Sequence, residues 1–433
     1  MNKILIVSSD EKTLKNITET ALGLDSSLIV FATGDRDEAL EILNYDLPSV
    51  SILDFSASGS DMYWLIEKIN EDPWLRYSGI IALYNEKRES EFAGKVKNSN
   101  IICPLHINYL AGRLNNILKI VLDNSHMLFQ REFQHHLSFS VAGSFVMDND
   151  PLQVNVFANI ITNYLINNNF IDMRRRDNIR IALVEILMNA VEHGNCGITF
   201  EEKTAGLLAG RSIFDLIGEK TADPQIAGRK VFFDYKIETG QSSFIIKDEG
   251  AGFDWQAAMK RKQDTGVILP HGRGILITSE VASRLSYNQK GNEATLVIEH
   301  QKNRTNLVPD LFRDTQEIFF NQGDIVFRRG DKSNYLFYIV NGEFAVFNQS
   351  QKIIDVLSPR DIFIGEMSFL LDDHRTATVK ARTQGTLIKI SKVDFIRAIK
   401  KQPYYALFLA RLLAGRLNKM NIQYEKYDQK VIT

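Results

Sequence analysis

The chain has 433 residues, which is too long for one hydrophobic core and predicts two to four domains. With 51 basic against 53 acidic residues, no overall electrostatic field favours nucleic acid or an anionic membrane. The sequence has no run near the roughly 20 apolar residues that span a bilayer, no signal-peptide pattern, and two cysteines that make no disulfide framework or metal cluster, so we expect a reduced, cytoplasmic, multidomain protein.

Residues 1–123 alternate short apolar strands with helices. We expect strands at Lys3–Val7, Leu28–Ala32, Ser49–Leu53 and Gly79–Leu83, and helices that start at Glu11, Asp37 and Met62. This rhythm predicts a doubly wound parallel sheet, in which functional groups gather at the carboxyl ends of the strands. Apolar residues from Leu105 to Val121 predict a last helix, either packed on its own sheet or running on toward the next domain.

This first segment resembles a response-regulator receiver domain of the flavodoxin-like fold. Asp54 lies where the phosphoacceptor would be, and Gly59 and Asp61 fit the loop after it. The resemblance implies a module that receives a phosphoryl group on Asp54 when its metal site is intact.

The departures from that pattern change the interpretation. Where a working receiver needs an acidic pair for Mg²⁺, the chain has Ser8 and Ser9, and Tyr84 takes the hydroxyl position after the fourth strand. Cys103 stands where the receiver has a lysine before a proline. Without the metal cage and the cation, phosphoryl transfer to Asp54 loses most of its electrostatic stabilisation. We therefore interpret residues 1–123 as a pseudo-receiver, a docking or dimerising module.

The central segment, residues 124–303, is expected to open with an edge strand at Leu137–Val146 and a helix at Pro151–Asn168. A second helix starts near Arg174, and its apolar residues at helical spacing form a buried stripe: Leu183, Ile186, Leu187 and Ala190.

In the second helix, Glu185, Asn189 and His193 are each four residues apart, so they stack on a face adjacent to the buried stripe. A carboxylate and a carboxamide one turn apart can hold Mg²⁺, or a water, against phosphate oxygens. About fifty residues later, a strand-like run delivers Asp248 at its end. Gly250 and Gly252 then let the backbone approach a flat ring without a side chain in the way.

A further glycine segment, His271–Ile275, precedes an apolar helical pattern that runs to Leu285. Its Gly272 and Gly274 would sit at a helix N-terminus, where free N–H groups bind phosphate. Helix, turn and glycine loop, in this order, resemble the Bergerat-fold ATPases, and specifically the anti-sigma-factor serine kinases.

That resemblance implies an α/β sandwich with ATP and Mg²⁺ as ligands. It implies Glu185 as the general base, Asn189 as the Mg²⁺ ligand, Asp248 as the adenine contact, and Gly272 and Gly274 as the phosphate loop. The segment Gly291–Thr295 matches the family's final Gly-Thr only in part, so adenine binding is expected more than a tight grip on phosphate.

Two other features of the central segment bear on this interpretation. Thr199–Arg229 is a polar insertion with too little apolar content for a core of its own, so we expect it to pack on the rim near the nucleotide. His135 and His136 precede a strand and are interpreted as a solvated linker rather than a phosphoacceptor, which disfavours an ordinary two-component histidine kinase.

From about Asn306 the pattern changes to short β runs with glycine punctuation. The runs are Asp324–Arg328, Tyr335–Val340, Glu343–Phe347, Ile353–Leu357 and Thr386–Ile390. Glycine-containing turns between them fit hairpins, so residues 306–433 are predicted to form an antiparallel β-jelly-roll barrel with flanking helices.

Within this segment, Phe363–Ala381 resembles the phosphate-binding cassette of cyclic-nucleotide-binding domains. Gly365 and Glu366 open a short turn, and Arg375 follows nine residues after Glu366. A cyclic phosphate is a small monoanion that fits one guanidinium and several N–H donors in a dry pocket. Arg375 would supply the guanidinium, and Glu366 would accept from the ribose 2′-hydroxyl. Backbone donors would come from Glu366, Met367, Thr376 and Ala377.

The base is left open between cAMP and cGMP, with the Thr376 hydroxyl favouring the 2-amino group of guanine. The alternative for this segment is a surface Glu/Arg pair on a β-barrel that binds no ligand.

Taken together, the sequence predicts a cytoplasmic signalling protein in which cyclic nucleotide regulates an ATP-binding, serine/threonine-kinase-like domain. The alternative is a non-catalytic, ligand-gated scaffold that binds ATP and sequesters a regulatory partner. The family resemblance implies a partner of the anti-anti-sigma or sigma-factor type. No DNA or membrane partner is expected, and a homodimer stays open.

Overall fold

The computed structural model describes residues 3–25, 27–56, 62–72, 75, 78–86, 96, 100–128, 140–168, 170–252, 282–300, 305–306 and 308–403, with isolated positions up to 417. The chain divides into two compact units. One comprises residues 1–137, 167–169 and 302–433, and the other comprises residues 138–166 and 170–301. None of the helices in these described ranges is both long and apolar enough to cross a membrane.

The first unit contains a five-stranded parallel sheet in the order β2-β1-β3-β4-β5. Its strands are β1 (Lys3–Val7), β2 (Ile29–Thr33), β3 (Val50–Asp54), β4 (Gly79–Tyr84) and β5 (Ile101–His106). Every residue of β3 is buried, because helices cover both faces, and such strands are near-continuous apolar runs. This strand order is the flavodoxin-like one, and the predicted doubly wound sheet is confirmed.

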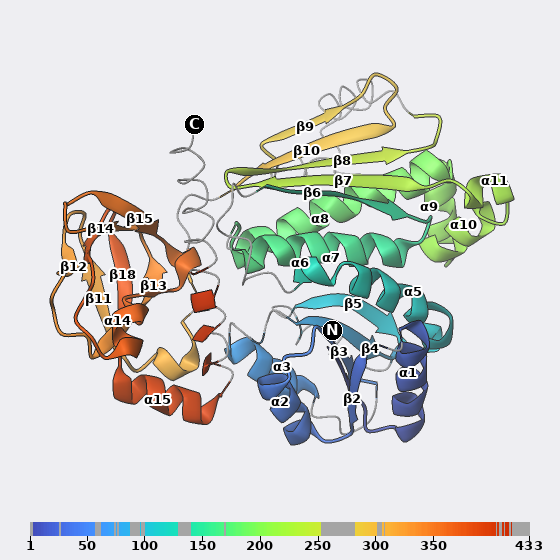
Figure 1. Ribbon diagram of the computed structural model, residues 1–433. Coiled ribbons are helices and arrows are strands. Elements are labelled where there is room, and N and C mark those ends of the chain that lie inside the picture. Colours follow the sequence, from blue (N-terminus) through green and yellow to red (C-terminus); the bar gives the residue numbers. More distant parts are fainter. Residues whose placement is uncertain are drawn as a thin grey trace, which may run out of the picture. The chain divides into compact units, whose positions relative to one another are not determined.

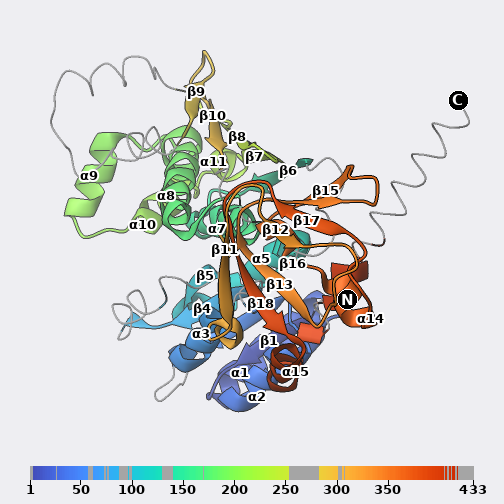
Figure 2. The ribbon, with the colours of Figure 1, turned by 90° about the vertical axis from the view of Figure 1, so that its left-hand side faces the viewer.

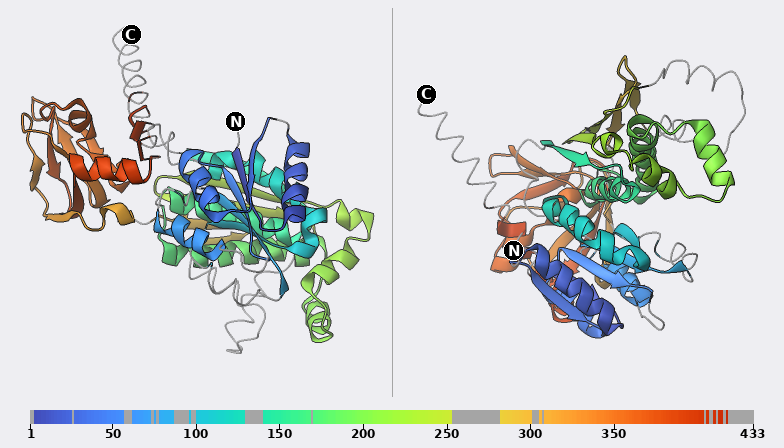
Figure 3. Two further views of the ribbon diagram at one scale, coloured as in Figure 1. Left: turned by 90° about the horizontal axis from the view of Figure 1, so that it is seen from below. Right: turned by 90° about the vertical axis from the view of Figure 1, so that its right-hand side faces the viewer.

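Four described helices flank the parallel sheet: α1 (Glu11–Leu24), α2 (Arg36–Tyr45), α3 (Met62–Glu71) and α5 (Leu110–Asp123). Helices α1 and α5 pack together on one face and α2 and α3 on the other (Figures 1 and 3). The last helix, α5, buries Leu114, Ile117, Leu118 and Val121, the apolar residues expected from the sequence. It therefore packs on its own sheet.

The second unit is an α/β sandwich. Its antiparallel sheet has the order β6-β7-β8-β10-β9, with β6 (Ser140–Met147), β7 (Val231–Glu238), β8 (Gln241–Asp248), β9 (Arg284–Tyr287) and β10 (Glu293–Glu299). Helices α7 (Pro151–Asn167) and α8 (Met173–Asn189) lie across one face (Figure 1). Burial alternates along β7 and β8, as expected for strands with one covered face.

One local expectation in this unit is wrong. The helical pattern expected to run to Leu285 does not, because Leu285 lies in β9 and pairs with Leu296 of β10. Beyond Asn189 the chain continues as a π-helical turn, Ala190–Asn195, which carries His193. The insertion folds as three short helices at one end of the sandwich (Figures 1 and 3): α9 (Phe200–Leu208), α10 (Ile213–Lys220) and α11 (Pro224–Ala227).

The C-terminal part of the first unit is a jelly roll of two four-stranded antiparallel sheets (Figure 2), β11-β18-β13-β16 and β12-β17-β14-β15. The strands expected from the sequence appear as β12 (Ile325–Phe327), β13 (Tyr335–Asn341), β14 (Phe344–Phe347), β15 (Ile353–Leu357) and β18 (Gly385–Ser391). Sequence reasoning missed β11 (Gln316–Phe320), β16 (Phe363–Ile364) and β17 (Thr378–Ala381). Aromatic and aliphatic side chains fill the space between the sheets, among them Phe327, Phe337, Ile339, Phe344 and Leu387.

Two helices accompany the jelly roll, α14 (Glu366–Leu371) and α15 (Lys392–Lys401). Where a turn was expected at Gly365 and Glu366, Gly365 is the N-cap of α14 in the left-handed conformation, with φ of 81°. Sheet, sandwich and jelly roll together confirm the predicted fold class.

Candidate functional site

A cavity of about 540 Å³ opens in the second unit between the end of α8 and the strands β8, β9 and β10. It is lined by Glu185, Asn189 and His193 from the helix, and by Asp248 and Gly252 from the turn after β8. Residues singled out more than fifty positions apart in the sequence therefore face one space. Gly272 and Gly274 lie outside the described residues.

Asp248 is the buried charge of this cavity, with 7% of its surface exposed. Its Oδ1 accepts a hydrogen bond from the Gly250 N–H at 2.8 Å. Burial raises the pKa of the Asp248 carboxyl above its ordinary value, against the lowering effect of that hydrogen bond. Asn292 fixes the backbone of the same residue: its Nδ2 donates to the Asp248 carbonyl at 2.9 Å, and its own carbonyl accepts from the Asp248 N–H at 3.0 Å.

Glycines around Asp248 are required by close approach. A Cβ on Gly194 would overlap the Asp248 carboxylate, and a Cβ on Gly250 would overlap the Gly194 carbonyl. Gly252 has a φ of 81°, in the left-handed region that favours glycine. The π-helical turn and the turn after β8 can therefore lie against each other only with small residues at this point.

Glu185 and Asn189 lie one turn apart near the end of α8, both partly exposed. Tyr287 of β9 completes this wall, and its pKa is raised to about 12 by burial and then by the charge of Glu185, so the phenol is neutral at ordinary pH. Amide and carboxylate oxygens fit Mg²⁺, which usually takes one or two protein oxygens and the rest from water and phosphate. The described residues hold no cluster of three or more His, Cys, Asp or Glu side chains suited to a metal.

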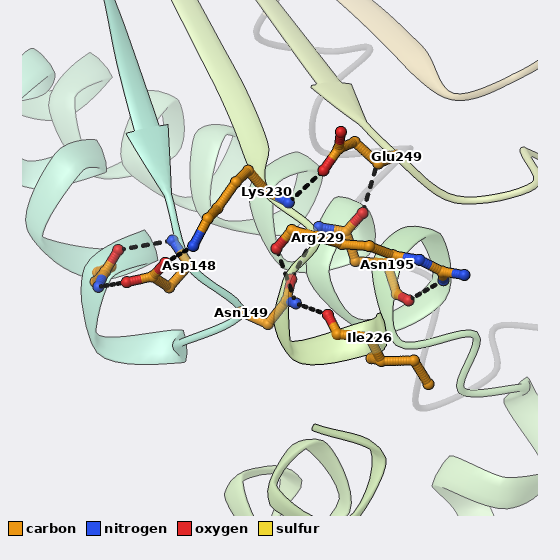
Figure 4. A network of polar contacts seen from close by, with 8 residues as sticks. Asp148, Asn149, Asn195, Ile226, Arg229, Lys230 and Glu249 are labelled. Carbon is orange, nitrogen blue, oxygen red and sulfur yellow. Dashed lines mark hydrogen bonds and ion pairs between the residues drawn. The ribbon is translucent and has the colours of Figure 1, made fainter. Parts of the chain in front are cut away.

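A polar network connects Asn195, the last residue of the π-helical turn, with Glu249, the residue after Asp248 (Figure 4). The amide of Asn195, fully buried, donates to Asn149 Oδ1 at 2.9 Å and accepts from the Glu249 N–H at 2.9 Å. Its backbone carbonyl accepts from Arg229 Nη1 at 2.6 Å, at the end of the insertion. Lys230 then bonds Glu249 through its N–H at 2.7 Å and Asp148 through Nζ at 2.6 Å. Sequence reasoning missed this network, because its members are scattered polar residues with no periodicity.

A second candidate site lies in the jelly roll, around Arg375. This arginine is 2% exposed and its guanidinium donates to protein acceptors: Nη1 to the Gly365 carbonyl at 2.7 Å and to Ser368 Oγ at 3.1 Å, and Nη2 to the Tyr335 carbonyl at 2.5 Å. It also stacks on the ring of Phe327 at 4.2 Å. Burial lowers the pKa of the guanidinium, and Nε has no hydrogen-bond partner among the described residues.

The other residues of the predicted cassette lie before and after Arg375 in the sequence. Glu366 is buried in the first turn of α14, whereas Met367 and Thr376 are exposed and Ala377 is half-buried. A Cβ on Gly365 would overlap the guanidinium of Arg375. Glycine at this position is therefore set both by its positive φ and by the charge beside it.

Asp54 ends β3 and is buried. One carboxylate oxygen accepts from Ser8 Oγ at 2.7 Å, and the other from the N–H and Oγ of Ser56 at 2.9 and 2.6 Å. Hydroxyls thus hold this carboxylate, and Ser8 is one of the two serines that replace the acidic pair. Gly59 and Asp61 lie outside the described residues.

Comparisons with known proteins agree with two of these regions. Residues 147–298 match the family model of the histidine kinase-like ATPase domain, and residues 317–402 match that of the cyclic nucleotide-binding domain. The cyclic AMP receptor protein of Thermus thermophilus is 29% identical over 112 residues, 25% of this chain and 51% of that protein. The cGMP-dependent protein kinase of Plasmodium berghei is 37% identical over 87 residues, 20% of this chain and 10% of the kinase.

Among solved structures, one from work on a cyclic-GMP-dependent pathway in bacterial phytopathogenesis is 26% identical and covers 25% of this chain and 89% of that chain, with a TM-score of 0.23. The chain thus spans about half of the first curated relative and a tenth of the second. The chain therefore combines a histidine kinase-like ATPase domain with a cyclic nucleotide-binding domain.

Proposed function

We propose that this chain is a signalling protein in which cyclic-nucleotide binding regulates an ATP-binding serine/threonine-kinase-like domain of the anti-sigma-factor type. The observation that carries the proposal is the cavity that Glu185, Asn189 and Asp248 line together, in a chain that also has the Gly365–Arg375 cassette. The chain would consist of three functional modules: a pseudo-receiver at 1–123, the kinase-like domain at 124–303 and the cyclic-nucleotide receptor at 306–433.

In the kinase-like domain, the buried Asp248 carboxylate would accept from the exocyclic amino group of adenine, because it has acceptor capacity beyond the Gly250 bond. Glu185 would take the proton from a serine or threonine hydroxyl of a partner as that oxygen attacks the γ-phosphorus and the bond to the ADP oxygen breaks. Asn189 would hold Mg²⁺, which neutralises phosphate charge when bound. The partner class is a protein of the anti-anti-sigma or sigma-factor type.

In the cyclic-nucleotide receptor, Arg375 would pair with the cyclic phosphate, and Glu366 would accept from the ribose 2′-hydroxyl. The buried and incompletely paired guanidinium supports this role, because a phosphate oxygen would supply a missing acceptor. The two curated relatives are named for cAMP and for cGMP, so the base stays open. The exposed Thr376 hydroxyl favours cGMP.

The pseudo-receiver would dock or dimerise without being phosphorylated. Hydroxyls of Ser8 and Ser56 hold Asp54, and a hydroxyl cannot replace the metal that withdraws charge in phosphoryl transfer. With labelled acetyl phosphate we expect no incorporation in the wild type or in Asp54→Ala. Labelling of the wild type that is lost in the variant would instead assign a working receiver.

The test of catalysis is transfer of labelled γ-phosphate from ATP to a candidate partner. Glu185→Gln should abolish transfer while leaving ATP affinity within about twofold, because the amide keeps the shape and loses the base. Glu293→Gln, another carboxylate that lines the cavity, is the matched control and should transfer normally.

The alternative is a ligand-gated scaffold that binds ATP and sequesters its partner without transferring phosphate. It predicts that no candidate partner is labelled by the wild type, while partner capture still depends on ATP. Regulation by cyclic nucleotide has its own requirement: the nucleotide must change ATP affinity by the factor by which ATP changes cyclic-nucleotide affinity. Calorimetric titrations in both orders that show no change would remove the regulatory link.

A further inference from the structure

The wall of the ATP cavity includes a side chain from the insertion. Lys203 of α9 lines the cavity, and its Nζ lies 2.5 Å from Glu192 Oε2. Glu192 is 3% exposed in the π-helical turn that follows Asn189, and the Lys203 side chain is 23% exposed. The pair therefore joins the insertion to the helix that carries Glu185 and Asn189.

Glu192 is a charge that needs this lysine. A carboxylate buried to this degree is costly unless it is paired, and Lys203 is the cation beside it. Burial and, second, the negative charge of Glu192 raise the pKa of the Cys196 thiol to about 11. Glu192 thus holds the ammonium group of Lys203 at a fixed place on the wall.

Lys203 also brings a positive charge to a cavity whose described lining residues include three carboxylates. Among the described residues that line it, Lys203 is the one arginine or lysine, beside Glu185, Asp248 and Glu293. ATP brings several negative charges, and a metal ion offsets only part of them. An ammonium group has three N–H donors, so Lys203 can keep its bond to Glu192 and still donate to a phosphate oxygen.

Helix α9, which carries this lysine, makes several contacts within the insertion. Thr199 and Glu202 form a capping box at the start of α9. Lys220 of α10 pairs with Glu202 at 2.9 Å, and Gly206 of α9 lies against Leu216 of α10. A donor that is fixed before the ligand arrives loses little entropy on binding.

We infer that Lys203 binds the polyphosphate of the nucleotide and makes the cavity discriminate ATP and ADP from adenosine, with Glu192 as its positioning residue. The inference rests on the proposed ATP-binding function and goes beyond it, because it gives the polar insertion a part in ligand selection. The ligand class is an adenine nucleotide with at least two phosphates.

The test is calorimetric affinity of the full chain for Mg-ATP, Mg-ADP and adenosine. Lys203→Met should weaken Mg-ATP binding about tenfold or more, as for loss of one charged hydrogen bond, and leave adenosine within about twofold. Lys203→Arg should keep most of the affinity for Mg-ATP. Lys236→Met, which removes an exposed lysine of β7 that pairs with Glu238, is the matched control and should bind like the wild type.

Lys203→Met leaves Glu192 buried without its cation, so it can lose stability. The double variant Lys203→Met, Glu192→Gln removes both charges and should fold, with the same loss of Mg-ATP affinity as the single variant. Glu192→Gln alone should lose less, because the lysine remains but is no longer held. If the losses of Mg-ATP affinity in this double-mutant cycle do not add, Lys203 and Glu192 act together in binding.

Two results would overturn the inference. Mg-ATP affinity unchanged in a folded variant excludes a phosphate contact, and equal losses for adenosine and Mg-ATP assign Lys203 a structural role only. A wild type that binds neither nucleotide nor adenosine is a different result, since it refutes the proposed ATP-binding function itself.

Discussion

The two candidate nucleotide sites bury opposite charges in a similar way. In the sandwich, the carboxylate of Asp248 is held by a backbone N–H from Gly250. In the jelly roll, the guanidinium of Arg375 is held by backbone carbonyls of Gly365 and Tyr335. Burial shifts both pKa values toward the neutral form, upward for Asp248 and downward for Arg375. In both places a nearby glycine leaves room for the charged group, Gly194 in one and Gly365 in the other.

The two sites differ in how the free-energy cost of burying the charged group can be reduced. A carboxyl group can take up a proton, so the Asp248 side chain tolerates burial with a single hydrogen-bond donor, the Gly250 N–H, among the described residues. An arginine cannot lose its proton in a protein, so the jelly roll must surround it with acceptors and aromatic faces, including Phe327 and Tyr335. We conclude that, among the described residues, the Arg375 side chain makes more hydrogen bonds and ring contacts with its fold than the Asp248 side chain does. Both side chains keep hydrogen-bonding capacity for a ligand.

The largest expected effect is loss of cyclic-nucleotide binding in Arg375→Leu. Affinity for cAMP and cGMP should fall about 100-fold or more, because several charged hydrogen bonds are lost. Mg-ATP affinity of the same variant should be unchanged when no cyclic nucleotide is present. Arg397→Leu, at an exposed arginine paired with Asp394, is the control. Cyclic-nucleotide affinity that survives in folded Arg375→Leu would contradict the assignment of this arginine.

Gly250→Ala tests the aspartate site in a comparable way. The new Cβ would overlap the backbone carbonyl of Gly194, so the two turns must separate. Mg-ATP affinity should fall at least about tenfold, and the free energy of unfolding should fall by about 1–3 kcal/mol, as in an overpacked core. Gly240→Ala, where nothing lies within 4 Å of the added Cβ, should change neither quantity measurably. Equal behaviour of the two variants would refute the close approach.

Gly365→Ala separates backbone strain from displacement of the guanidinium. Gly323 has a similar positive φ, 91° against 81°, but open space at the Cβ position. Both alanine variants should lose about 1 kcal/mol of stability from the left-handed backbone. Only Gly365→Ala should also weaken cyclic-nucleotide binding, about tenfold, because its Cβ displaces Arg375. Equal cyclic-nucleotide affinity in the two variants would count against this explanation.

The smallest effect concerns the stability of the aspartate site as a function of pH. The folded chain holds the Asp248 proton more tightly than the unfolded chain, whose value is 3.8. The stability that this proton contributes is full below pH 3.8 and is lost as the pH rises through the folded pKa. Asp248→Asn should therefore melt at a higher temperature than the wild type at pH 7, and the difference should shrink as the pH falls toward 3.8.

Thermal melts across that pH range check this expectation. Asp234→Asn, at an exposed position on β7, is the control and should show no such trend. If the difference in melting temperature between Asp248→Asn and the wild type stays constant from pH 7 to pH 4, burial of the Asp248 carboxylate carries no free-energy cost.

Much of the fold was predictable because the relevant patterns are local. The buried strands β1 and β3 are continuous apolar runs, and the strands β13 and β18 are bounded by turn residues. The missed strands lack such patterns. Strand β11 is mostly exposed and β16 has two residues, so pairing with neighbouring strands, rather than their own composition, makes them strands. Pairing with β10 likewise makes Leu285 part of a strand.

The same distinction applies to the cavity. Glu185, Asn189 and Asp248 were found because a helix spacing and a glycine turn mark them. Tyr287 had no such mark, since it reaches the cavity through the pairing of β9 with β10 far along the chain. Gly194 was the one missed residue with a usable sign, because a glycine within a helical pattern often indicates close packing. Its reason, contact with Asp248, required the fold.

The sequence by itself determined which chemical groups this protein has and which of them share a turn or a strand, because helix and strand periodicity act over a few residues. Only the tertiary structure decided which charges are buried and what compensates them. Asp248, Glu192 and Arg375 are ordinary polar residues in the sequence, and each becomes costly or useful only when distant segments exclude water around it.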